Sequence, residues 1–253
     1  MKTLVIANQK GGVGKTSTLV HLAYFFQEKG KRVAVVDLDT QGNASYTLAS
    51  FSRSLYASSL FQPEAPKMPV ARKDISVIPA DPSLIAVESL PRTEAQQRLR
   101  RNMHKLGEEG YDVCLVDTAP ALGIRMSAAL ASADFVLSPI ELEVYSIQGI
   151  KMMLATIFNI RKECAPGLSF LGMLPSRVDS RNPRHKAHLQ ELQAAYPKLL
   201  VPVTIGQRSN VANALASQLP VWRIRKTAAR SAAKEFRDLG KYVFDKLYPG
   251  EAS

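Results

Sequence analysis

The sequence predicts a single α/β domain over residues 1–253, in which helices flank both faces of a mostly parallel, twisted sheet. Short apolar runs alternate with amphipathic stretches along the chain, and a glycine-rich loop joins the first run to the first stretch. Short runs that are apolar throughout predict strands buried on both faces, which is typical of parallel sheets. Ligands of such sheets bind at the carboxyl ends of the strands, so we expect the functional site there.

Each expected element follows from this alternation. We expect seven strands, at residues 3–8, 32–38, 75–79, 113–117, 135–138, 170–174 and 199–203. We expect helices near residues 15–30, 82–109, 119–133, 146–163, 183–196 and 227–247. Residues 50–73 show neither pattern and contain three prolines, so we expect a surface excursion there and no domain boundary.

The composition is that of an ordinary globular protein, with 46% hydrophobic and 22% charged residues. The net charge of +11 exceeds what a nucleotide site requires and indicates a polyanionic partner, either nucleic acid or an anionic membrane surface. The two cysteines, Cys114 and Cys164, lack metal-type spacing and favour a reducing compartment. The chain starts with a strand pattern rather than a signal peptide and has no apolar run of the ~18–20 residues that a membrane span needs, so we expect a cytoplasmic protein.

The glycine-rich loop covers residues 8–17, N-Q-K-G-G-V-G-K-T-S, directly after an apolar run. Glycines allow backbone N–H groups to converge on phosphate oxygens, and the helix that starts near Lys15 directs its positive end to the same point. The Lys15 ammonium can bridge the terminal phosphates, and the Thr16 hydroxyl can bind Mg²⁺. The sequence therefore predicts a P-loop nucleoside triphosphatase whose nucleotide-binding residues are Lys10, Gly11, Gly12, Val13, Gly14, Lys15, Thr16 and Ser17.

Three acidic residues stand at the ends of predicted strands. Asp37 and Asp39 end one strand, and Asp117 ends another. Phosphoryl transfer to water needs a metal, a positioned water and charge stabilisation at the γ-phosphate. Asp117 is suited to hold Mg²⁺ through a water, Asp39 to orient or deprotonate the attacking water, and Asp37 to support the metal shell. A single acid at a strand end is as often an N-cap or a turn residue, but three beside a phosphate loop favour catalysis.

The loop departs from the pattern G-x-x-x-x-G-K-[ST], because Gln9 stands at the first glycine and an extra lysine, Lys10, precedes the double glycine. Together with the strand ends Asp37-Leu-Asp39 and Asp117-Thr-Ala-Pro120, this loop resembles the deviant Walker A ATPases of the ParA/MinD group, over essentially the whole chain. The resemblance implies ATP and Mg²⁺ as cofactors. It also implies a homodimer in which Lys10 contacts the phosphates bound by the other subunit, much as an arginine finger does.

The residue patterns make Lys15 and Asp39 catalytic and assign Thr16, Asp117 and Asp37 to the metal, and the resemblance adds Lys10 as a catalytic residue. Thr40 stands where many relatives have proline, and we expect this to alter the stiffness of the loop and to leave activity intact. Relatives place residues 176–179 and a segment near Pro202 around adenine. Residues 176–179 read S-R-V-D and only faintly match the guanine-binding pattern N-K-x-D, so we favour ATP.

Within the group, the chain resembles the ParA-type partition ATPases of plasmids and chromosomes, on residues 138–143, 145–149 and 181–185. The resemblance implies a slow, Mg-dependent ATPase that a ParB-type centromere-binding partner stimulates. It implies a cytoplasmic, nucleoid-associated ATP dimer that binds double-stranded DNA without sequence preference. Long members carry an N-terminal helix-turn-helix, but the first strand pattern here begins at residue 2, so we expect neither that module nor autorepression.

The expected last helix, residues 227–247, carries a basic stripe. Arg230, Lys234, Arg237 and Lys241 recur at spacings of 4, 3 and 4, so they fall within about 60° of one another. Like charges on one stripe repel unless an anion lies there, although most such stripes are solvated helix faces. The family resemblance implies DNA contacts near the C-terminal helices, by position from Arg208, Arg223, Arg225, Lys226, Arg230, Lys234 and Arg237. Phosphate contacts would give steep salt dependence and little sequence preference.

Two other function classes remain open. A MinD-like membrane switch would need a C-terminal amphipathic helix that is free to enter the bilayer surface. We expect the apolar face of this helix to dock on the core, which argues against a membrane partner. A metabolic enzyme of the same superfamily would be an iron–sulfur reductase or a small-molecule ligase. Cys114 lies within a predicted strand and cannot easily reach a cluster, and His185 and His188 have no evident third metal ligand.

Overall fold

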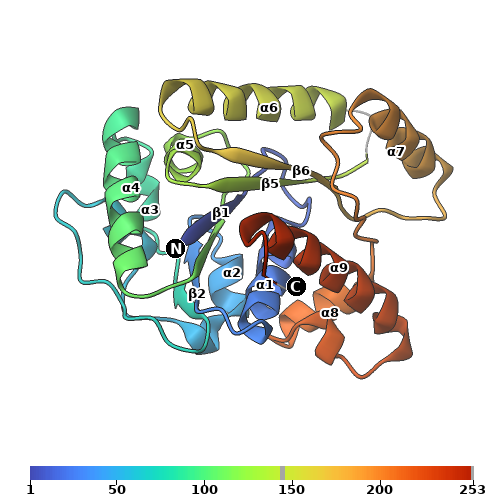
Figure 1. The fold of residues 1–253 in the computed structure, drawn as a ribbon, viewed down its shortest axis with the longest axis horizontal. Coiled ribbons are helices and arrows are strands. Elements are labelled where there is room, and N and C mark those ends of the chain that lie inside the picture. The colour runs from blue at the N-terminus through green and yellow to red at the C-terminus, as the bar shows by residue number, and fades with distance from the viewer. Residues whose placement is uncertain (143–145, 252–253) are drawn as a thin grey trace.

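Six parallel strands form the centre of the computed structural model, which describes residues 1–142 and 146–251 (Figure 1). The strands are β1 (Lys2–Ile6), β2 (Val33–Asp37), β3 (Ser76–Ile78), β4 (Val113–Asp117), β5 (Phe135–Ile140) and β6 (Ser169–Pro175). Their order across the sheet is β3-β2-β4-β1-β5-β6, and every pairing is parallel. The predicted fold class is confirmed, and the loop after β1 lies beside the carboxyl ends of β4 and β5.

Helices cover both faces of the sheet (Figure 1). One layer holds α1 (Lys15–Glu28), α2 (Asn43–Thr47), α8 (Ser209–Ala216) and α9 (Arg230–Leu247). The other holds α3 (Leu84–Val87), α4 (Arg92–Glu108), α5 (Ile124–Ala131) and α6 (Ser146–Glu163), and α7 (Pro183–Ala195) packs near the end of β6. Because side chains alternate along a strand, Leu4 and Ile6 join the first core, whereas Val5 and Ala7 join the second.

Helix α9 is packed tightly against α1. Phe236 and Phe244 of α9 are almost completely buried, and the Phe244 ring stacks on Phe26 of α1 with centroids 5.9 Å apart. Gly240 permits this close approach, because a Cβ there would lie 2.4 Å from the ring of Phe25. The apolar face of α9 is therefore docked on the core, as expected. Among the described residues, no helix is both long and apolar enough to cross a membrane.

The end of α9 lies at the amino edge of the sheet. The Tyr248 hydroxyl donates a hydrogen bond of 2.9 Å to the carbonyl of Asp112, which directly precedes β4. The Lys31 ammonium, just before β2, lies 2.6 Å from the carboxylate of Glu251. The C-terminal residues that the structure describes are thus held on the side of the sheet opposite the phosphate loop.

Residues 50–73 form less of a surface excursion than expected. They include two short 3₁₀ helices, η1 (Ala49–Phe51, partly within this range) and η2 (Ala57–Phe61). Leu60 and Phe61 are buried in the second core, and the Asn102 side chain of α4 donates to the carbonyl of Leu60 at 2.7 Å. This segment therefore packs along α4 as part of the domain.

The seventh expected strand is wrong. Residues 199–203 make only an isolated bridge between Met173 and Leu200, with backbone hydrogen bonds on either side of Met173. Pro202 follows at once and has no N–H to continue a ladder, which explains why the pairing stops.

Three expected helices differ in extent from the prediction, and the helices α2 and α8 were not expected. The stretch at 82–109 divides into α3 and α4 around Pro91, which cannot lie inside a helix without removing a hydrogen bond. The stretch at 119–133 becomes helical only from Ile124. A 3₁₀ turn, η4 (Thr227–Ala229), precedes α9, and another, η3 (Val221–Arg223), follows the unexpected α8. Residues 143–145, which belong to two segments of the family resemblance, lie outside the described residues.

Candidate functional site

The glycine-rich loop follows β1 and closes around Lys15. Gly12 and Gly14 have φ of 76° and 92°, a conformation that favours glycine, and a Cβ on Gly14 would lie 2.7 Å from the Ser176 hydroxyl. The Lys15 ammonium donates to the carbonyl of Lys10 at 3.1 Å, across the loop. The chain thus forms the backbone cradle that the motif predicts, with Lys15 directed into it.

Burial and neighbouring charges shift the pKa of the Lys15 ammonium in opposite directions. Its side chain is buried, and burial lowers the pKa of its ammonium, whereas the carboxylates of Asp117 and Asp39 act in the opposite direction. The predicted lysine and two of the predicted acids are therefore close enough to interact electrostatically. Gly11 and Gly12 are exposed and Val13 is buried, so the glycines face solvent where phosphates would bind.

Asp117 and Thr16 form the inner wall of the site. The Thr16 hydroxyl donates to Asp117 Oδ2 at 2.7 Å, whereas Asp117 Oδ1 is buried and has no hydrogen-bond partner among the described residues. Burial and the neighbouring Asp37 raise the pKa of Asp117 to about 8. A hydroxyl and an unsatisfied carboxylate oxygen are the hard donors that Mg²⁺ prefers, so these two residues fit the predicted metal position.

Asp37, which was predicted to support the metal shell, accepts hydrogen bonds from the chain through both carboxylate oxygens. Its Oδ1 accepts from the backbone N–H of Asp39 at 3.1 Å, and its Oδ2 accepts from both the N–H and the hydroxyl of Ser45. Both oxygens are thus engaged by the chain itself, which favours a role in holding the Asp39 loop over a role in the metal shell. Asp39 is nearly buried, and its Oδ1 accepts from Gln41 N–H at 3.0 Å. Within the described residues, no group of three or more His, Cys, Asp or Glu side chains is arranged to hold a metal ion.

A cavity of about 440 Å³ opens beside the loop. Its lining combines the phosphate loop, the start of the segment after β6, the residues just before α8 and α8 itself. These residues are Gly12, Gly14, Ser17, Ser176, Arg177, Ile205, Gly206, Gln207, Arg208, Ser209, Val211, Ala212 and Leu215. Pro202 does not line it, and Asp179 instead lies 3.3 Å from the Arg181 guanidinium. Most of the α8 side was missed from the sequence, because nothing in residues 205–215 marks a pocket until the chain folds back over the loop.

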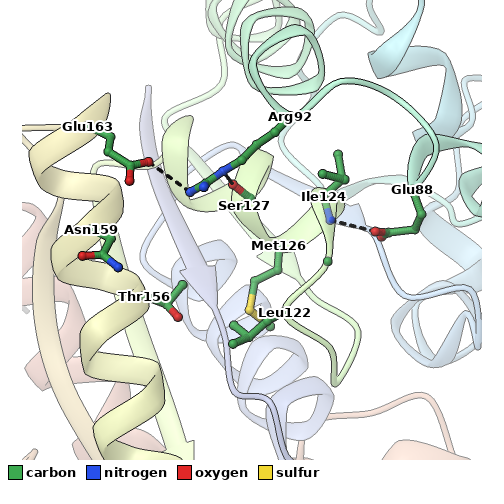
Figure 2. A pocket seen from close by; sticks show the side chains of 10 residues that line it. Glu88, Arg92, Leu122, Ile124, Met126, Ser127, Thr156, Asn159 and Glu163 are labelled. Atoms are coloured by element: carbon green, nitrogen blue, oxygen red, sulfur yellow. Dashed lines mark hydrogen bonds and ion pairs between the residues drawn. The ribbon is translucent and has the colours of Figure 1, made fainter.

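A second hollow of about 350 Å³ lies between α5 and α6 and contains none of the predicted site residues. Figure 2 shows the Arg92 guanidinium between Glu163 and Ser127, and the Glu88 carboxylate beside the backbone nitrogen of Ile124. The Ile124 N–H donates to Glu88 Oε2 at 2.7 Å, which caps the start of α5. These contacts account for its polar lining as helix capping and a surface ion pair.

The basic residues predicted to bind DNA fall into two groups. Four have acidic partners within the chain: Arg208 pairs with Glu235, Arg223 and Arg237 with Glu28 at 3.3 and 3.6 Å, and Lys234 with Asp238 at 2.6 Å. Arg237 also lies over the ring of Trp222, 5.0 Å from its centroid. Arg225, Lys226 and Arg230 are exposed, and no ion pair is found for them among the described residues. The second group is the more available to an external anion.

His21 connects α1 to this basic region. Its Nδ1 lies 2.6 Å from the carbonyl of Ser17, and its Nε2 accepts from the backbone N–H of Val221 at 3.1 Å. The ring stacks on Phe236 of α9 with centroids 3.9 Å apart. Complete burial lowers the pKa of His21 to about 4, so the imidazole is neutral and carries its proton on Nδ1.

Comparisons with known proteins agree with this geometry. A family model described as an AAA domain matches residues 1–170. Protein IncC of Escherichia coli is 56% identical over 258 residues, which cover 98% of this chain and 70% of that protein. The chromosome-partitioning ATPase Soj of Thermus thermophilus is 38% identical over 183 residues, 72% of this chain and 71% of that protein. The chain belongs to the ParA-type partition ATPases.

A solved structure places this ParA-type chain in a wider group. Cobyrinic acid a,c-diamide synthase from Mycobacterium smegmatis, with bound ADP and magnesium, superposes with a TM-score of 0.79 at 25% identity and covers 99% of this chain and 97% of that one. The shared fold therefore includes a small-molecule enzyme, which is one of the alternatives raised by the sequence. The much higher identity to IncC, over nearly the whole chain, favours the partition class over the metabolic one.

Proposed function

We propose that this ParA-type ATPase is an ATP-driven DNA-segregation switch. ATP and Mg²⁺ bind at the phosphate loop, two copies close around the nucleotides, and the closed dimer binds double-stranded DNA without sequence preference. A ParB-type centromere-binding partner stimulates slow hydrolysis, which releases the dimer. The protein is then cytoplasmic and nucleoid-associated. The observation that carries the proposal is the pair formed by Thr16 and Asp117, with its unpartnered carboxylate oxygen beside the buried Lys15.

The residues of the loop have separable roles in this proposal. Backbone N–H groups of residues 10–17 bind the phosphates, and Lys15 neutralises charge at the terminal phosphate. Thr16 and Asp117 would hold Mg²⁺, which when bound supplies further positive charge at the phosphate oxygens. Asp39 orients the attacking water or accepts its proton, and the hydrogen bond from its own N–H to Asp37 holds it in place. Lys10 acts on the nucleotide of the partner subunit.

The base and ribose occupy the cavity that the loop shares with α8. This choice is supported by its direct continuity with Gly12, Gly14 and Ser17, which lie at the phosphate end. Ser176 and Arg177 contribute to the lining as the family resemblance implies, whereas a role for Pro202 would require a different path of the segment. Because Asp179 does not line this cavity, the carboxylate that would contact guanine is missing, which supports ATP.

DNA binding is assigned mainly to the exposed basic residues near the start of α9. Arg225, Lys226 and Arg230 carry it, and Lys234 and Arg237 contribute where DNA phosphates displace Asp238 and Glu28. Arg208 lines the nucleotide cavity and pairs with Glu235, so it is assigned to that cavity and not to DNA.

The deciding experiment measures binding to nonspecific duplex DNA with ATP, with ADP and without nucleotide, across a salt series. Affinity that requires ATP and falls steeply with salt is the expected result, because phosphate contacts release counterions. Binding that ignores the nucleotide would uncouple the basic residues from the loop and overturn the proposal. Sedimentation with anionic vesicles serves as the control for the membrane alternative, and no ATP-dependent association is expected.

A further inference from the structure

Glu141 holds Lys10 within its own subunit. The Lys10 ammonium lies 2.9 Å from Glu141 Oε2, and the Arg177 guanidinium lies 3.7 Å from Glu141 Oε1. The sheet order explains the contact, since β5 lies between β1 and β6 and Glu141 directly follows β5. The carboxylate is thereby placed between the loop after β1 and the segment after β6.

The two side chains of this ion pair differ in freedom. The Glu141 side chain is 17% exposed, whereas the Lys10 side chain is 45% exposed. Glu141 is therefore the fixed partner, and Lys10 is a long side chain able to leave it for another position. The backbone of Lys10 stays anchored meanwhile, because its N–H donates to Asn8 Oδ1 at 2.8 Å and its carbonyl accepts from Lys15.

We propose that Glu141 is a positioning residue for Lys10 that opposes dimer closure. This inference rests on the proposed function, in which Lys10 reaches the phosphates of the partner subunit. One ammonium cannot occupy both places, so the ion pair with Glu141 must break before Lys10 crosses the interface. The contact thus favours the open subunit and sets how much ATP-bound protein is needed for closure.

Arg177 allows Lys10 to leave Glu141 and to return to it. Its Nη1 donates to the carbonyl of Gly12 at 2.9 Å, and its Nε stays near Glu141. When Lys10 departs, Glu141 retains a cation and is not left as an isolated, mostly buried charge. The contact with Lys10 can therefore be lost at small cost, as a contact that is broken in every cycle requires.

The test measures dimer formation against protein concentration by sedimentation, with a non-hydrolysable ATP analogue. Glu141→Gln is expected to lower the concentration for half-dimerisation about fivefold, the size expected for a partly exposed ion pair. This difference should shrink as salt is raised, because screening weakens the pair in the wild type. It should also vanish when Lys10→Ala is present in both proteins, since the effect passes through Lys10.

The matched control is Glu163→Gln. The substitution also removes an ion pair of 3.2 Å with an arginine, Arg92 (Figure 2), but Glu163 lies at the end of α6, the helix that leads to the start of β6. It should leave dimerisation unchanged. Two results would overturn the role of Glu141 alone. In the first, the wild type dimerises and Glu141→Gln has the same concentration for half-dimerisation. In the second, Glu141→Gln has an equal effect when Lys10→Ala is present in both proteins. A wild type that does not dimerise with the analogue would overturn the proposed function, and this inference with it.

Discussion

The carboxyl edge of the sheet and the basic region around α9 organise charge in opposite ways. At the carboxyl edge, Lys15, Asp37 and Asp117 are buried, and hydrogen bonds within the chain hold all three. Around α9 the charges are exposed, and several are neutralised by acids that lie far away in sequence, such as Glu28. One buried carboxylate oxygen, Asp117 Oδ1, has no hydrogen-bond partner among the described residues, whereas much of the exposed charge is already balanced by ion pairs. Net charge therefore says less about function than the partner of each charged group.

The largest expected effect separates the two lysines at the carboxyl edge. Lys15→Ala should lower nucleotide affinity at least about 100-fold, because it removes a buried charge from the phosphate cradle. Lys10→Ala should change that affinity less than about threefold but reduce dimerisation and ATP hydrolysis at least about tenfold, since in the proposed dimer Lys10 acts across the interface. Titration with a fluorescent ATP analogue, with sedimentation and phosphate release, measures these effects. Equal losses of nucleotide binding in both variants would remove the distinction.

The next largest effect concerns the packing of α9 on α1, which joins the basic region to the rest of the domain. Gly240→Ala should destabilise the protein by about 2–3 kcal/mol, because the new Cβ would overlap the ring of Phe25. Gly167→Ala is the control, since a Cβ there meets nothing within 4 Å, and its effect should stay within about 0.5 kcal/mol. Urea unfolding measures both. Similar stabilities would show that α9 can shift on α1 without cost.

A third effect depends on pH. His21 has a pKa of about 4 in the folded protein and about 6.5 when unfolded, so the unfolded chain takes up the proton first as the pH falls. The contribution of neutral His21 to the free energy of unfolding is complete above pH ~6.5. The free energy of unfolding that is lost between pH 7 and pH 5 should reach about 2 kcal/mol. His21→Leu should have lower stability at pH 7 but lack this component of the pH dependence. Parallel curves for the two proteins in urea unfolding at both pH values would contradict the neutral, buried imidazole.

The smallest effect tests the division of the basic residues. Neutralising Arg225, Lys226 and Arg230 together with glutamine should weaken DNA binding about tenfold and reduce the salt slope by about 2–3, because up to three phosphate contacts disappear. Neutralising Arg223 and Arg237 should affect DNA less and stability more, since both hold Glu28. Fluorescence anisotropy with ATP present measures the affinities. The reverse ranking would show that the paired arginines are the DNA contacts.

The difference between the two regions also explains what the sequence could predict. The phosphate loop and the acids at the strand ends were predictable because each is a local pattern tied to one strand or turn. The pairing of Glu28 with Arg223 joins residues 195 positions apart, and the α8 wall of the cavity forms only when the chain returns over the loop. Asp37 illustrates the limit, because its position was predicted but its hydrogen bonds to Ser45 depend on how α2 packs.

The anchoring of the last described residues has a practical consequence. Tyr248 and Glu251 are fixed beside Asp112 and Lys31, on the side of the sheet away from the phosphate loop. A fluorescent protein or an affinity handle attached after them would emerge on that far side, with the nucleotide edge facing outward. Surface-tethered single molecules would then leave the nucleotide edge open to the solution.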